Sequence, residues 1–294
     1  MALNLIASQE ERLASAEVMR SLRRGIEQVG AATLLVPSFA QALEAQRALS
    51  AERGLALGVQ VTTPSAWVRD TWEVWGDGRS LADGCVLTVL SYEALRGATE
   101  SERGPLAALP GVVEVLAQLV RDALPWLPLD EAGHVDESAR EAVGLTVGET
   151  CLVGLAGKVA RMLEEHGYVS PSSVVTLLPA ALAEAGAKVP HLVVSGFSWM
   201  KRSDRELVSA LGQCTEVTFV AQMPQGPASE RVRHLLALLC PSGTDWVMAE
   251  QSVAAEQMTG PTGPSTVPLG REAKLQELLD ALFGTETIDA GDDA

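Results

Sequence analysis

Two groups of aromatic side chains stand beside cations where predicted strands end. One follows a strand at 58–63 and the other follows a strand at 191–197. Ligands gather at the carboxyl ends of parallel strands, and aromatic rings beside cations suit stacking on the bases of single-stranded nucleic acid. The competing interpretation is that the rings pack where the sheet meets the next helix. The candidates are Trp67 and Arg69 in the first group, and Phe197, Trp199, Lys201 and Arg202 in the second.

The first predicted strand leads into a segment where a phosphate-binding loop is expected. Such a loop needs glycines whose backbone N–H groups surround the phosphates, and a lysine that reaches the terminal phosphate. This chain has Ser8-Gln9-Glu10-Glu11 there, without glycine or lysine, and the two glutamates would repel a triphosphate. The same residues fit a capping box, which predicts a helix that begins beside Ser8.

The second half of an ATPase site is missing as well. A core strand should end in a carboxylate that holds Mg²⁺, but VVSGF places Ser195 there. The four histidines and four cysteines form no motif of a metal site or a hydrolase. We therefore expect no catalytic, cofactor-binding or metal-binding residue. A non-standard site built around Ser195 and His191 stays open as an alternative.

The charge of the chain limits where a nucleic acid can bind. With 38 acidic and 22 basic residues, the net charge is −16. Most of the surface should repel a phosphate backbone, so such contact is confined to a local arginine-rich strip. The helical pattern after residue 8 leaves Arg12, Arg20, Arg23 and Arg24 mostly on its exposed side. No long apolar segment or signal peptide is present, which predicts a cytoplasmic protein without a membrane partner.

The elements that position these residues alternate between strand and helix at both ends of the chain. The order at the start is βαβαβ, which predicts a parallel sheet with helical crossovers. Only helical patterns follow, from about residue 80 to 186. Strands are predicted at 3–7, 32–38, 58–63, 191–197, 216–223 and within 245–250; the helices between them are predicted from residue 8 to Val29, through 39–54, and at 64–75, 203–211 and 229–240.

This order predicts an α/β domain that is split by a helical insertion. The first part of the α/β domain is assigned to 1–78, the helical insertion to 79–187 and the second part to 188–250. A linker rich in glycine and proline, a short helix and an acidic tail occupy 251–294.

Several blocks of the chain resemble one protein family. They are ATLLVPSFAQALEAQRAL, VQVTTPSAWVRDTW, HGYVSPSSVVTLLPAAL and HLVVSGFSWMKRSDRELVSAL. In this order they resemble the N-terminal region of AddB/RexB, the non-motor subunit of the bacterial AddAB-type helicase–nuclease. The resemblance implies a superfamily 1 helicase-like 1A domain, with a P-loop NTPase-like topology but no P-loop, and an all-helical 1B insertion.

The resemblance also implies a function in double-strand-break repair. The chain would be a non-catalytic module that guides or scans the 3′-ended single strand and docks an AddA-like helicase–nuclease subunit. Positions that read bases in some relatives are Ser38, Phe39 and Gln41 here, so Phe39 and Gln41 join the candidate DNA-binding residues. Two alternatives stay open: an α/β enzyme that binds a nucleotide or small molecule at a non-standard site, and a purely architectural domain.

Overall fold

The computed structural model describes residues 2–10, 12–52, 57–226, 228–239 and 247–248. This part of the chain is an α/β protein built on a six-stranded sheet in the order β3-β2-β6-β7-β1-β8, in which all neighbours are parallel. The strands are β1 (Ala2–Ser8), β2 (Ala32–Leu35), β3 (Val59–Thr62), β6 (His191–Ser195), β7 (Glu216–Gln222) and β8 (Val247–Met248).

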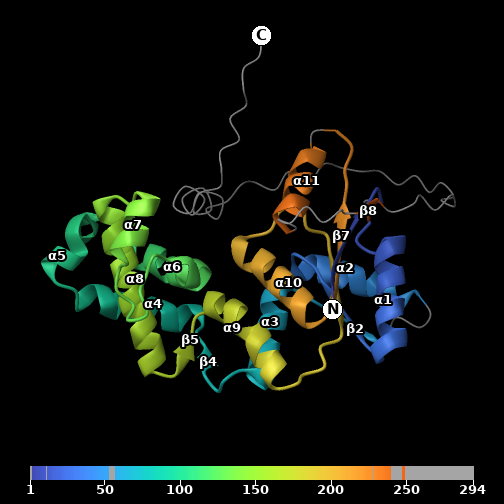
Figure 1. Ribbon diagram of the computed structural model, residues 1–294, viewed down its shortest axis with the longest axis horizontal. Helices are drawn as coiled ribbons and strands as arrows, with labels where there is room; N and C mark the ends of the chain where they lie inside the picture. The colour runs from blue at the N-terminus through green and yellow to red at the C-terminus, as the bar shows by residue number, and fades with distance from the viewer. Residues whose placement is uncertain (1, 11, 53–56, 227, 240–246, 249–294) are drawn as a thin grey trace, which may run out of the picture.

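Helices cover both faces of this sheet (Figure 1), as is usual for parallel strands. One face carries α1 (Ala16–Val29) and α2 (Phe39–Ser50), whose core includes Leu34 and Val193 of the sheet. The opposite core includes Leu35 and Val194, because successive side chains of a strand point to opposite faces. The helices on that face are α3 (Pro64–Trp75), α9 (Pro171–Glu184), α10 (Arg202–Cys214) and α11 (Ala228–Leu239).

The remaining helices form a body of their own beside the sheet (Figure 1). They are α4 (Gly84–Arg96), α5 (Glu100–Arg103), α6 (Val112–Ala123), α7 (Glu137–Val143) and α8 (Val147–Glu165), with 3-10 turns η1 (Gly104–Ala108) and η2 (Leu124–Trp126). Their core contains the fully buried Leu116 and Val159. The chain enters and leaves this helical body through β4 (Ser80–Leu81) and β5 (Tyr168–Val169), which pair in parallel. By contrast, α9 buries Leu178 in the core beside the sheet.

The predicted α/β class with a parallel sheet is confirmed. The predicted strands of the sheet are all present, and α3 has the predicted limits at residues 64 and 75. β4 and β5 were not predicted, because two-residue strands leave no periodic signal. The prediction for 251–294 lies outside the described residues. In the described part of the chain, no helix combines the length and apolar character needed to cross a membrane.

The predicted start of the first helix is wrong. β1 continues through Ser8, which pairs with Gln222 of β7, and the hydroxyl of Ser8 accepts a hydrogen bond from the N–H of Glu10 in a loop instead of capping a helix. α1 begins eight residues later, at Ala16. Its N-cap is Ser15, whose hydroxyl accepts a hydrogen bond from the N–H of Val18 at 3.4 Å.

Candidate nucleic-acid interface

The parallel strands bring their following loops to one edge of the sheet, which we call the carboxyl edge. β1, β2, β3, β6 and β7 all end there, because neighbouring strands run in the same direction. Two of these loops are the places where the two halves of a nucleotide site would be expected from the sequence. They are the segment 9–15 after β1 and the segment 196–201 after β6.

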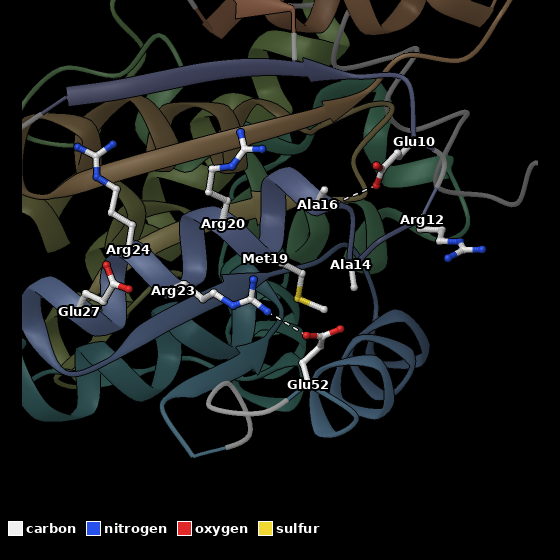
Figure 2. A pocket seen from close by; sticks show the side chains of 10 residues that line it. All are labelled: Glu10, Arg12, Ala14, Ala16, Met19, Arg20, Arg23, Arg24, Glu27 and Glu52. Atoms are coloured by element: carbon white, nitrogen blue, oxygen red, sulfur yellow. Dashed lines mark hydrogen bonds and ion pairs between the residues drawn. The ribbon is translucent and has the colours of Figure 1, made fainter. Parts of the chain in front are cut away.

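The loop 9–15 supplies an anion of its own to the N-terminus of α1. The carboxylate of Glu10 accepts a hydrogen bond from the backbone N–H of Ala16 at 2.9 Å (Figure 2). The Ser8 hydroxyl accepts one from the N–H of Glu10 at 3.2 Å and so fixes the start of the loop. The free N–H groups of a helix N-terminus attract phosphates. At α1, a carboxylate of the protein already holds one of them.

The loop after β6 packs directly against the loop after β1. The buried hydroxyl of Ser195 donates to the carbonyl oxygen of Leu13 at 3.4 Å. Gly196 has a φ of 86°, and a Cβ added there would lie 2.8 Å from Leu13 Cδ2 and 3.2 Å from Pro37 Cδ. Only glycine suits both this backbone conformation and this contact. Protein atoms therefore fill the space between the two halves of the expected nucleotide site.

Ser195 and His191 do not form one site. His191 begins β6 and Ser195 ends it, which places them at opposite edges of the sheet, about 13 Å apart along the strand. A nucleophile and its base must lie within hydrogen-bonding distance. His191 is buried, and its Nε2 lies 3.0 Å from the hydroxyl of Thr218 instead.

The loop 196–201 has two side chains in the core and two exposed to solvent between them. Phe197 is only 5% exposed and lies against Phe219, with ring centroids 6.5 Å apart, and Met200 is buried as well. Between them, Trp199 is 56% exposed. Two buried anchors thus hold the indole of Trp199 outward, which lowers the entropy lost when it binds a ligand. Phe197 itself is a core residue and is not accessible for stacking.

Lys201 and Arg202 contact the helical body. The ammonium of Lys201 lies 3.9 Å from the carboxylate of Asp122, at the end of α6. The guanidinium of Arg202 lies over the ring of Trp126 in η2, 5.2 Å from its centroid. Nearby, burial raises the pKa of Asp204 in the first turn of α10. Both cations remain partly exposed, but in this structure they join the two bodies.

The residues after β2 and β3 divide into exposed and buried positions. Phe39 is 73% exposed at the start of α2, next to the half-buried Gln41. Trp67 is 5% exposed and packs in the core beside the sheet, so it is not accessible to a base. Arg69 is exposed and pairs with Asp70 at 2.8 Å, and this hydrogen bond raises its pKa.

The structure brings Phe39 and Trp199 to neighbouring strands. β2 and β6 pair with Leu35 opposite Val194, and each exposed ring follows the end of its strand by four residues. Arg12 is exposed on the adjoining loop 9–15. These three side chains are among the exposed members of the candidate interface. Trp126 was missed by sequence reasoning, because it comes from a distant segment and no local pattern marks it.

No model of a known protein family matches the chain, and neither does any curated protein. Among the described residues, no three His, Cys, Asp or Glu side chains are grouped as a metal site would require.

Proposed function

We propose that the chain is a helicase-like module without ATPase activity that guides single-stranded DNA. In this proposal the sheet and its covering helices are a 1A-type domain, and the helical body is its 1B-type insertion. The module acts on the 3′-ended strand in double-strand-break repair and docks an AddA-like helicase–nuclease subunit.

The observation that carries the proposal is the contrast between the two parts of the carboxyl edge. Where a motor would hold a nucleotide, Leu13, Gly196 and the carboxylate of Glu10 fill the space. On the adjoining strands, Phe39 and Trp199 present exposed rings to solvent. A site closed to ATP beside open aromatic rings suits a protein that holds a strand but does not drive it.

The alternative of a nucleotide-binding enzyme receives less support from these contacts. A phosphate at the N-terminus of α1 would have to displace Glu10, and a ligand between the two loops would have to displace Leu13. An architectural domain remains the second candidate, favoured by the net charge of −16. If the chain is an architectural domain, substitution of Phe39 or Trp199 should not change the binding of any ligand.

The test is the binding of a fluorescently labelled oligothymidine with a free 3′ end, measured by anisotropy at low salt with and without the partner subunit. Phe39→Ala and Trp199→Ala should each weaken binding by about 1–3 kcal/mol, roughly 5- to 150-fold, through the loss of one stacked base. Trp75→Ala is the matched control. Trp75 is 41% exposed, but it ends α3 and therefore lies away from the carboxyl edge.

Two results would count against the proposal. The first is no detectable binding at low salt, either alone or with the partner. The second is an equal effect of all three substitutions, which would show that the rings at the carboxyl edge have no special role.

A further inference from the structure

A hollow of about 920 Å³ runs along the outer side of α1 and carries an unusual concentration of arginine. Figure 2 shows Arg12 at one end and Arg24 at the other, with Arg20 and Arg23 between them. The floor is formed by small or apolar side chains such as Ala14 and Met19. Four arginines and three glutamates line this hollow, in a chain with 16 more acidic than basic charges.

The guanidinium groups of the helix are accessible. The side chains of Arg20, Arg23 and Arg24 are each more than half exposed, although each has a carboxylate partner. The distances are 2.8 Å from Arg20 to Glu17, 2.9 Å from Arg23 to Glu52 and 3.4 Å from Arg24 to Glu216. Glu17 is buried, whereas Arg23 and Glu52 form an exposed pair, and an exposed pair contributes about 0–1 kcal/mol. A phosphate can therefore compete with Glu52 for Arg23 at little cost. It can also use the exposed sides of the guanidinium groups of Arg20 and Arg24.

The spacing of the cations fits a chain of phosphates. Arg20 lies one helical turn from Arg23 and Arg24, about 5.4 Å along the axis. Arg12 extends the row to the loop after β1, which belongs to the carboxyl edge. Guanidinium groups bind phosphates with two parallel hydrogen bonds, which a lysine ammonium cannot do, and every cation that lines the hollow is an arginine.

We propose that this hollow binds the sugar–phosphate backbone of the single strand whose bases stack on Phe39 and Trp199. The inference rests on the proposed function and extends it, because it assigns the backbone contacts that the carboxyl edge itself lacks. The strand runs from the carboxyl edge past Arg12 and along α1. The apolar floor accepts the sugars, and the arginines face the phosphates.

The test is the salt dependence of oligothymidine binding. Each arginine that neutralises a phosphate contributes about 0.7 to the slope of log affinity against log salt for a single strand. The double variant Arg20→Gln and Arg23→Gln should therefore lower the slope by about 1.4. The matched control is Arg96→Gln with Arg140→Gln, because both arginines lie on helices of the helical body and pair with a glutamate three residues earlier.

The outcomes separate this inference from the proposed function. An unchanged slope in the Arg20 and Arg23 variant overturns the inference, while the effects of Phe39→Ala and Trp199→Ala still support the proposed function. A lower slope together with no effect of the aromatic substitutions supports the backbone site and removes the stacking site. No binding by the unchanged protein overturns both.

An acidic protein segment is the competing occupant, and polyglutamate is its probe. If polyglutamate competes with oligothymidine at equal charge concentration, and the Arg20 and Arg23 variant loses both ligands alike, the hollow recognises negative charge alone. That result overturns the assignment to nucleic acid. If polyglutamate competes at least tenfold more weakly than unlabelled oligothymidine does, the assignment to nucleic acid is supported.

Discussion

At the scale of residues, side chains of the protein occupy the positions where a nucleotide site would be expected from the sequence. Glu10 binds an N–H of α1 that would otherwise attract phosphate, and Leu13 lies against Gly196 between the two loops. Ser195 is fully buried and hydrogen-bonded to the backbone of Leu13. Each of these contacts depends on Glu10 or Leu13 in the loop after β1. A single substitution at Ser195 should therefore not restore a nucleotide site.

The variant Ser195→Asp tests this dependence. A carboxylate at Ser195 would be buried beside the carbonyl oxygen of Leu13 without a cation, so we expect a loss of about 3–5 kcal/mol in the free energy of unfolding. Urea denaturation measures it, and calorimetry should detect no Mg·ATP binding. Ser198→Asp is the control, because Ser198 is exposed in the same loop and should change stability by less than about 0.5 kcal/mol. ATP binding by Ser195→Asp would contradict the account.

His191 makes stability depend on pH. Burial lowers its pKa below the ordinary value of 6.5, and the nearby Arg24 lowers it further, although Glu216 acts in the opposite direction. The folded state therefore binds fewer protons than the unfolded state, and stability is lost as pH falls from about 6.5 toward the folded pKa. We expect the unchanged protein to lose more unfolding free energy between about pH 7.5 and pH 5.5 than His191→Gln does.

The control for the substitution itself is His134→Gln, because the side chain of His134 is 69% exposed. The pKa of Asp204 is raised, so its effect on stability has the opposite sign, but Asp204 is present in all three proteins and its contribution cancels. An identical loss in the unchanged protein and in His191→Gln would contradict the assignment.

At the scale of elements, the loop 196–201 connects the candidate interface to the helical body. Its anchors fix Trp199, and the next residues, Lys201 and Arg202, bind Asp122 and Trp126. A ligand on Trp199 thus contacts the segment that holds the two bodies together. Movement of the helical body and binding at the carboxyl edge should be linked through this loop.

The double variant Asp122→Asn and Trp126→Leu tests the junction. It removes a partly exposed ion pair and a cation–π contact, which together contribute about 1 kcal/mol. Amide hydrogen exchange in 198–204 and 124–129 should become roughly 3- to 10-fold faster. Glu114→Gln, on the exposed side of α6, is the control and should leave exchange unchanged. Unchanged exchange in the double variant would show that these contacts do not hold the junction.

The sequence was a good guide to the elements and a poor guide to their ends. Buried strands such as 191–195 carry continuous apolar runs, which are readable without tertiary information. The start of α1 was misplaced because Ser8 and Glu11 satisfy a local capping pattern, whereas the pairing of β1 with β7 involves residues more than 200 positions away. The sequence located the candidate aromatic residues but could not show which of them are exposed. Trp67 and Phe197 are buried by packing against distant segments, which no local pattern encodes.

At the scale of the whole molecule, the net charge of −16 would limit any bound nucleic acid to one region of the surface. Phe39, Trp199 and Arg12 are exposed at the carboxyl edge, and this net charge should make most of the remaining surface repel phosphate. The sheet provides the rigid frame, and the helical body adds a contact at one side of it. This arrangement predicts a single path for one strand across the carboxyl edge.

The most direct measurement of that path is photocrosslinking of an oligothymidine that carries 5-iododeoxyuridine, followed by mass spectrometry of the crosslinked peptides. Stacked rings should react, so the account predicts crosslinks at Phe39 and Trp199. Crosslinks at other exposed aromatics, such as Trp75 or Tyr92, or no crosslinks at low salt, would contradict it.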